Sequence, residues 1–164
     1  MRHRIWRHFL TTRFALRRAF PPRTLAAIEH AVGESEKRHS GEIRFAIETA
    51  LDVPALLRGV TARDRAIAAF AQLGTWDTAA NNGVLIYLLL AERDIEIVAD
   101  RGFTGRVSQE EWQAVCDSVR EAFAGGKFEA GSLEVIRRVG ELIAPHFPSL
   151  PGDVDELPDR PALL

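Results

Sequence analysis

The feature that most constrains the fold is a pair of apolar segments joined by a short polar one. Residues 84–90 are seven apolar residues in a row, too few to span a membrane but suited to a strand that is buried on both faces. Residues 91–94 form a polar turn, and the segment that begins at Ile95 alternates between apolar and polar residues. This pattern predicts a hairpin with one central strand and one half-covered strand, and it places Asp100 at a strand end.

The rest of the chain predicts helices around this hairpin. Helical patterns cover residues 24–39, 61–74, 108–124 and 130–144, and residues 42–50 alternate as a strand does. Thr61 with Asp64, and Ser108 with Glu111, have the spacing of capping boxes. A strand, helix, strand unit makes a parallel pair with a right-handed crossover. We therefore expect an α/β fold in the order α-α-β-α-β-β-α-α, with a small mixed β-sheet sandwiched between helices.

The charge is distributed unevenly along the 164 residues, a length that suffices for one domain with a core. Residues 1–28 contain seven arginines and no acid, so with a net charge of −2 the remainder carries −9. Three parts are expected: a basic arm (1–20), a domain (22–148) and a Pro-rich acidic tail (149–164) that is disordered. An acidic body argues against nucleic acid as a partner, because phosphate binding needs clustered Lys and Arg.

Residues 2–20 are predicted to form one basic amphipathic helix. Its apolar face carries Ile5, Phe9, Leu16 and Phe20, with Trp6 and Leu10 at the edge, and its opposite face carries Arg4, Arg7, Thr11 and Arg18. Three interpretations remain open. The helix could pack on the body, it could lie on an anionic membrane with Trp6 and Phe9 inserted, or it could dock on a protein partner.

The sequence contains no segment typical of membrane insertion or export. It has no apolar run of about 18 residues, and Arg13, Arg17 and Arg18 interrupt every apolar stretch that a signal peptide would need. We expect a cytoplasmic protein, with peripheral contact to the inner face of the membrane through the arm.

Polar residues are predicted to meet at the edge of the sheet where the central strand begins. The candidates are Glu42, Asp77, Asn81, Asn82 and Asp100. Oxygen ligands of this kind suit Ca²⁺ or Mg²⁺, so Asp77, Asn81, Asn82 and Asp100 form a candidate metal site. Alternatively, Asn82 and Gly83 shape the loop and Asp100 bonds backbone amides near Gly102.

The polar face of the first strand is a second candidate. Glu42, Arg44 and Glu48 are expected to face Glu96 and Asp100 across the sheet. They form either a ladder of ion pairs, in which Arg44 binds a carboxylate in bidentate fashion, or a polar groove for a ligand or partner. No catalytic residue is predicted, since the five histidines lack metal-ligand spacing and Cys116 lies on an apolar helix face.

Several short motifs, in their order and spacing, resemble a TPM domain. They are Ser40-Gly41-Glu42-Ile43-Arg44, Asn82-Gly83-Val84-Leu85, Asp100-Arg101-Gly102-Phe103, Trp112 and His146-Phe147-Pro148. The resemblance covers residues 22–148 and is closest to short bacterial members without an export signal. It implies a four-helix, small-sheet sandwich. Two positions depart from the exported members, which commonly have an acid at position 81 and Gly at position 100.

The family includes a thylakoid-lumen acid phosphatase and photosystem-repair factors, and some members bind calcium through loop carboxylates. The bacterial members are similar to proteins encoded beside LemA-type membrane proteins. The resemblance therefore implies a LemA-type membrane protein as partner. We expect a non-enzymatic accessory domain that acts at or near the membrane and supports a membrane protein complex. A divalent-metal-dependent phosphatase acting on phosphate monoesters, and a regulatory subunit that self-associates through its arm, are the alternatives.

Overall fold

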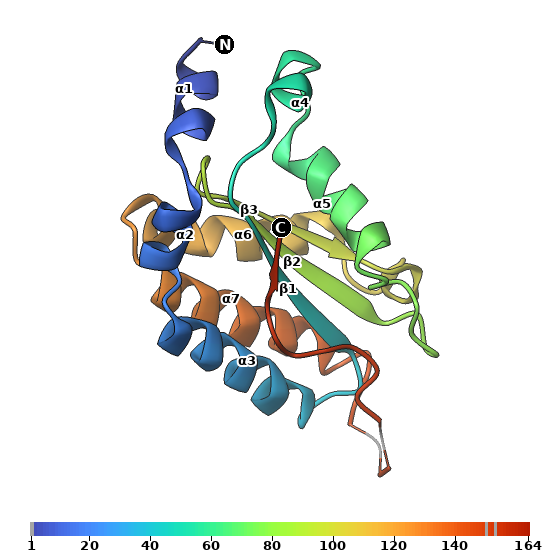
Figure 1. The fold of residues 1–164 in the computed structure, drawn as a ribbon. Coiled ribbons are helices and arrows are strands. Elements are labelled where there is room, and N and C mark those ends of the chain that lie inside the picture. Colours follow the sequence, from blue (N-terminus) through green and yellow to red (C-terminus); the bar gives the residue numbers. More distant parts are fainter. Residues whose placement is uncertain (1, 150, 153) are drawn as a thin grey trace.

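The computed structural model describes residues 2–149, 151–152 and 154–164 (Figure 1). The helices are α1 (Arg2–Leu10), α2 (Arg13–Ala19), α3 (Pro22–Glu36), α4 (Val53–Leu57), α5 (Ala62–Gln72), α6 (Gln109–Ala124) and α7 (Phe128–Ile143), with a 3-10 turn η1 (Arg101–Phe103). The strands are β1 (Glu42–Glu48), β2 (Gly83–Leu89), β3 (Asp94–Ala99) and β4 (Ala162–Leu163). Their order in the sheet is β3-β2-β1-β4, so the predicted α/β fold with a mixed sheet is confirmed.

The hairpin of β2 and β3 has the predicted form, with β2 inside the sheet and β3 at its edge. Every residue of β2 is buried, and β3 pairs with it in antiparallel register from Val84–Ala99 to Leu89–Asp94. On its other side β2 pairs with β1 in parallel, as expected for strands joined by a crossover through α5. The apolar run is buried on both faces because β2 has neighbours on both sides and helices above and below.

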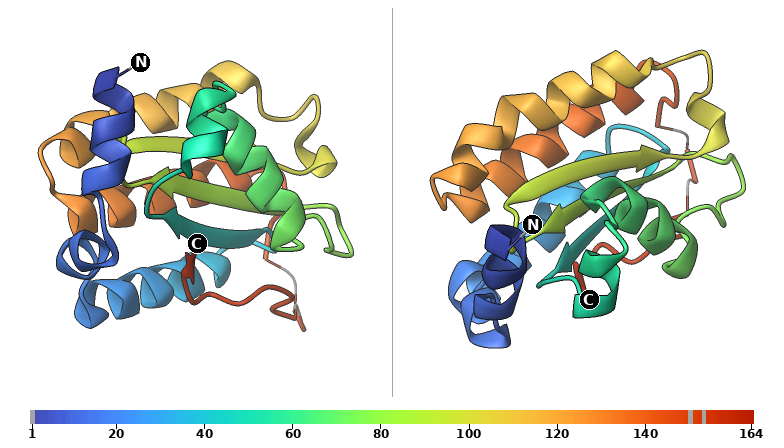
Figure 2. Two further views of the ribbon diagram at one scale, coloured as in Figure 1. Left: turned by 45° about the horizontal axis from the view of Figure 1, so that its top comes forward. Right: turned by 90° about the horizontal axis from the view of Figure 1, so that it is seen from above.

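The sheet separates two apolar layers (Figure 2). On one face, side chains such as Phe45 and Ile86 pack with α3, α6 and α7, and on the other, Leu85 and Tyr87 pack with α4 and α5. Both predicted capping boxes are present at the starts of α5 and α6. The short α4 was not predicted; it begins at Asp52, whose side chain accepts a hydrogen bond from the Ala55 N–H at 2.8 Å.

The expectation of one helix over residues 2–20 is wrong, because the arm is broken into α1 and α2. Thr12 has an extended backbone (φ −100°, ψ 172°) and begins α2 as its N-cap. The break lets α2 turn its apolar side inward, so that Leu16 and Phe20 join the core. The Phe20 ring lies 5.4 Å from that of Phe128. The arm therefore packs on the body.

The expectation of a disordered tail is also wrong for residues 154–164; residues 150 and 153 lie outside the described residues. Leu157 is buried, and β4 pairs in parallel with β1 at Ala46–Ala162 and Ile47–Leu163. Composition suggested disorder, but the uncovered edge of β1 offers backbone hydrogen bonds that a short strand can use. Within the described residues, none of the helices is long and apolar enough to cross a bilayer.

Candidate functional site

The predicted metal-site residues come from three segments that meet where β2 begins. The Glu42 N–H donates to the Asn82 carbonyl at 3.2 Å, and the Asp100 N–H donates to the Gly83 carbonyl at 2.9 Å. Gly83 is required here because a Cβ at this position would lie 1.9 Å from the Thr75 carbonyl oxygen. Asn81, Asn82 and Asp100 therefore share one edge of the sheet, whereas Asp77 is exposed on the loop before them.

Two side-chain oxygens in this region are buried without a hydrogen-bond partner among the described residues, Asn82 Oδ1 and Asp100 Oδ2. Buried acceptors of this kind are what a cation site offers. The other Asp100 oxygen accepts from the Arg101 N–H at 2.7 Å, as expected if Asp100 bonds nearby backbone. The Arg101 side chain donates to Asn81 Oδ1 at 2.8 Å. Since Asp77 is exposed on the loop, Asp100 is the one carboxylate beside Asn81 and Asn82, and a guanidinium already binds Asn81. This set makes a poor fit to Ca²⁺, which prefers several anionic oxygens.

The predicted ladder of ion pairs along β1 does not form. Glu48 instead pairs with Arg65 of α5 at 3.0 Å and accepts from the Tyr87 hydroxyl at 2.6 Å. Glu96 lies 3.4 Å from Arg63, also on α5. Burial and this hydrogen bond to Glu48 raise the pKa of Tyr87, so the hydroxyl is held as a donor. The face is covered by α5, which satisfies charges that the strands alone would have paired with each other.

The other two residues of that face are bound by the tail. The Glu42 carboxylate accepts from the N–H groups of Glu156 and Leu157 at 3.2 and 3.1 Å. Arg44 donates to the carbonyls of Pro158 and Arg160, the second at 2.7 Å. These residues hold the chain's own C-terminal segment and are not left open to a ligand.

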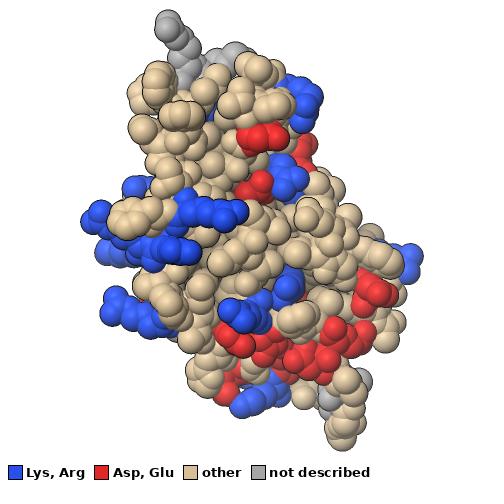
Figure 3. Space-filling model, viewed as in Figure 1, with Lys and Arg blue, Asp and Glu red and all other residues tan. Residues whose placement is uncertain are grey.

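A cluster of carboxylates that the sequence analysis missed lies beside the tail. Carboxylate oxygens of Glu36, Asp155 and Asp159 are all within 4.8 Å of one another, and Figure 3 shows acidic side chains gathered where α3 and the tail meet. Burial, and then the charges of Glu42 and Asp159, raise the pKa of Glu36 to about 9. Burial is also the main reason that the pKa of Glu42 rises to about 7. The four acids of the tail were visible in the sequence, but their contact with α3 depends on how the tail folds back.

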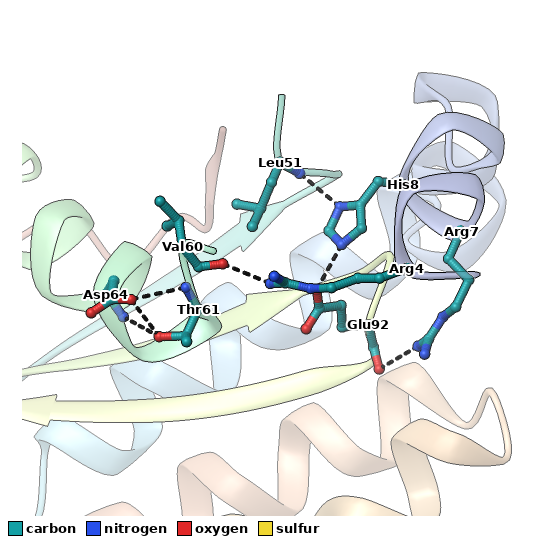
Figure 4. A network of polar contacts seen from close by, with 8 residues as sticks. All are labelled: Arg4, Arg7, His8, Leu51, Val60, Thr61, Asp64 and Glu92. Atoms are coloured by element: carbon teal, nitrogen blue, oxygen red, sulfur yellow. Dashed lines mark hydrogen bonds and ion pairs between the residues drawn. The ribbon is translucent and has the colours of Figure 1, made fainter. Parts of the chain in front are cut away.

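The opposite end of the sheet carries a second polar network, centred on Glu92 in the turn after β2 (Figure 4). Its carboxylate accepts from Arg4 Nε at 2.6 Å and bonds His8 Nε2 at 2.7 Å. His8 is buried, and its Nδ1 accepts from the Leu51 N–H at 2.9 Å, which leaves the ring proton on Nε2. Arg4 also donates to the Val60 carbonyl at 2.7 Å. This network fixes α1 on the body.

Cys116 offers no nucleophile. Its side chain is buried in α6, and burial, with nearby acidic groups, raises the pKa of its thiol to about 12. The reactive form of cysteine is the thiolate, which is scarce at neutral pH in this position. Cys116 packs as a small apolar residue, as predicted.

A model of the TPM domain matches residues 17–142, most of the chain. The chain belongs to the TPM domain family. The BA42 protein of the psychrophilic bacterium Bizionia argentinensis has a similar solved structure, with 30% identity and a TM-score of 0.76 over 87% of this chain and 93% of that chain. The N-terminal domain of the cg2496 protein from Corynebacterium glutamicum shares the fold, with 15% identity and a TM-score of 0.54 over 74% of this chain and 72% of that chain. No curated protein matches.

The family match confirms the resemblance read from the motifs and separates the TPM domain from its two flanking segments. Residues 2–16, with α1 and the start of α2, precede the matched range, and residues 143–164, with the tail, follow it. The Glu92 network and the carboxylate cluster each join one flanking segment to the domain.

Proposed function

We propose that this TPM domain protein is a non-enzymatic accessory domain that works at a membrane surface, where it contacts anionic lipid through residues 2–20. The observation that carries the proposal is the exposure of large apolar side chains on the arm. Trp6, Phe9, Leu10 and Phe14 are 61%, 73%, 70% and 76% exposed. Side chains of this size and exposure on one short segment are typical of an interaction surface.

The way the arm is anchored supports this assignment. Arg4 and His8 bind the body through Glu92, so the polar side of α1 faces inward and its aromatic residues face out. Trp6 and Phe9 contact each other edge to face, with ring centroids 6.2 Å apart. Aromatic residues beside arginines suit the boundary between lipid headgroups and acyl chains, and a segment with no acid is attracted to anionic lipid.

The partner that we propose is a membrane protein of the LemA type, as the family resemblance implies. A domain that binds weakly through one amphipathic segment needs a second contact for stable attachment. A membrane protein would supply it. Co-purification of the full-length chain with a LemA-type protein from detergent extracts, lost in the double variant Trp6→Ser, Phe9→Ser, is the expected result.

Vesicle flotation tests the membrane contact. Vesicles with anionic phosphatidylglycerol should carry the protein upward, and neutral phosphatidylcholine vesicles should carry much less. The double variant Trp6→Ser, Phe9→Ser should reduce the bound fraction about tenfold, because each removes apolar area from the interface. The matched control is Trp76→Ser, which alters an exposed tryptophan on the loop before β2. Equal capture of all three proteins would exclude the arm as the lipid contact.

A divalent-metal-dependent phosphatase is the second candidate, favoured by the unpaired oxygens of Asn82 and Asp100. These residues, with Asn81, would hold the ion, which would polarise a phosphoryl oxygen when bound. Arg101 on Asn81 argues against it. Calorimetry with Ca²⁺ and Mg²⁺, and hydrolysis of a generic phosphate ester, should both fail for Asp100→Asn if this candidate is correct. Activity that persists in that variant and with a chelator would rule it out.

A further inference from the structure

A groove of about 870 Å³ lies at the carboxyl end of β2, between the arm, the turn at residues 90–94 and the end of α6. In sheets with parallel strands this end is where ligands commonly bind. The groove combines charged side chains with apolar ones, among them Leu10, Ala15 and Ala19 from the arm and Phe128 from α7. Leu10 also belongs to the exposed apolar set of the arm, so the groove opens onto the surface that we propose contacts lipid.

Two guanidinium groups line this groove without a carboxylate partner. Arg7 Nη2 donates to the Glu92 carbonyl at 3.0 Å, and Arg93 Nη1 donates to the Ala124 carbonyl at the end of α6. Neither arginine forms an ion pair with any described residue. Arg7 therefore reaches the turn from the arm, and Arg93 extends from the same turn to the end of α6. Arg93 is held there by a left-handed backbone (φ 54°) and by the Phe128 ring, 6.0 Å from its guanidinium carbon.

The acids that line the groove are largely balanced within the chain. Glu92 is paired with Arg4 and His8. Asp94 is half-buried; burial raises its pKa, and the nearby Arg120 opposes that rise. Arg120 itself pairs with Asp117 at 2.6 Å. Arg7 and Arg93 are therefore the cations of the groove that no described carboxylate pairs, and they lie beside its apolar side chains.

We propose that this groove binds one anionic phospholipid, with its phosphate between Arg7 and Arg93 and an acyl chain along Leu10, Ala15 and Phe128. Planar guanidinium groups bind phosphate oxygens through paired hydrogen bonds. The apolar side chains of the lining favour an anion that carries an acyl chain over a fully hydrated one. The inference rests on the proposed membrane function and names the lipid chemistry that the arm would recognise. Arg7, Leu10 and Ala15 precede the range that matches the TPM domain, whereas Arg93 and Phe128 lie within it, so the site needs both the arm and the domain.

A short-chain lipid separates this site from general membrane attachment. We expect dihexanoyl phosphatidylglycerol, kept below its micelle concentration, to shift backbone amide NMR signals of residues 90–94 and 120–128. Arg93→Gln should weaken this binding about tenfold, because one charged pair of hydrogen bonds is lost. Arg93→Lys keeps the charge but not the paired hydrogen bonds, and should restore only part of the binding. Arg58→Gln, at an exposed arginine after α4, is the control and should change affinity less than about twofold.

The outcomes distinguish the site from the proposed function. If vesicles capture the protein but the short-chain lipid does not bind, the groove is excluded and membrane contact stands. If the short-chain lipid binds but vesicles do not capture the protein, the groove stands as a lipid site and the proposed membrane contact is excluded. Inorganic phosphate that binds as tightly as the lipid would show that the groove takes a soluble anion, and binding that Arg93→Gln leaves unchanged would overturn the assignment. Thermal unfolding of each variant checks that the fold is intact.

Discussion

The arm (2–20) and the tail (154–164) both fold back on the TPM domain, but different forces hold them. The arm brings the Arg4 guanidinium to the Glu92 carboxylate, which also accepts from His8 Nε2–H, and it anchors Leu16 and Phe20 in the core. The tail brings acids toward acids, with Asp155 and Asp159 beside Glu36. Backbone hydrogen bonds to Glu42 and to β1 hold it in place.

Two segments that attach to the same sheet can therefore respond differently to pH and to salt. Opposite charges in the arm attract, so its docking gains from electrostatics. Like charges beside the tail repel unless a proton neutralises one of them. The arm is therefore expected to be the firmer attachment at neutral pH, and the tail the one that loosens as acids ionise. The contrast between arm and tail can be tested by mutation, pH and salt.

The largest effect should come from truncating one apolar anchor in each segment. Leu16 and Leu157 are similarly buried, at 8% and 7% exposed, which makes them a matched pair. Leu16→Ala should lower the free energy of unfolding by about 3 kcal/mol, because Leu16 belongs to the main core cluster. Leu157→Ala should lower it by about 1.5 kcal/mol, since Leu157 packs outside both clusters. Urea unfolding measures both, and equal losses would contradict the difference in anchoring.

Removal of the Glu92 carboxylate should come next. In Glu92→Ala the buried His8 Nε2–H loses its acceptor and Arg4 loses its ion pair, a loss of about 2 kcal/mol. Hydrogen exchange at the Leu51 amide, which donates to His8 Nδ1, should speed up because α1 loosens. Glu92→Gln keeps an acceptor oxygen and is the control, with about half the effect. An unchanged exchange rate at Leu51 in Glu92→Ala would show that the network does not hold the arm.

The pH dependence should distinguish the tail from the arm. The folded-state pKa values of Glu36 and Glu42 rise to about 9 and about 7 from 4.5. The folded protein therefore binds these protons more tightly than the unfolded chain. The resulting stability is complete below about pH 4.5 and is lost as the pH rises through about 7 and toward about 9.

We expect the free energy of unfolding to fall between about pH 5 and pH 9, with faster exchange of the Leu157 amide. Glu36→Gln keeps an oxygen that can accept from the Ile43 N–H and should flatten most of this dependence. Steady exchange at Leu51 over the same range serves as the internal reference. Slower exchange of the Leu157 amide as the pH rises would contradict the raised pKa values of Glu36 and Glu42.

Salt should have the smallest effect, with opposite signs in the two segments. Raising the ionic strength from about 0.05 M to about 1 M screens the partly exposed Arg4–Glu92 pair and should weaken arm docking by about 0.5 kcal/mol. The same change screens repulsion among the tail acids at pH values where they are ionised, and should tighten the tail. Amide exchange at Leu51 and Leu157 reports both in one sample. Parallel shifts at the two amides would remove the contrast.

The parts of the fold that were predictable are those encoded by neighbouring residues. The run 84–90 must be covered on both faces whatever surrounds it, and the capping boxes at Thr61 and Ser108 close within four residues. Asn82, Gly83 and Asp100 could be placed at one edge because a hairpin fixes its own register. The break at Thr12 was harder to predict. It depends on a balance between the free energy gained by burying Leu16 and the free energy that an unbroken helix would gain.

The partners of the charged residues were not predictable, because they come from segments that are distant in the sequence. From the sequence, Arg44 and Glu42 could have paired with charged residues across the sheet. The position of the tail gives Arg44 backbone carbonyls and Glu42 backbone amides as partners instead. The prolines and acids of residues 149–164 carry no strand pattern, and β4 is just two residues long. A segment that short is ordered by the edge it joins and not by its own preference.

Residues close together in the chain are enough to predict the buried hairpin, the α/β order, the TPM resemblance and the surplus of arginine in the arm. Only the folded chain shows which carboxylates have a raised pKa, and which buried oxygens and which arginines lack a partner among the described residues. Those outcomes depend on burial and on groups 40 to 115 positions apart in the chain, such as His8 with Leu51 and Glu42 with Leu157. Local sequence cannot specify such distances.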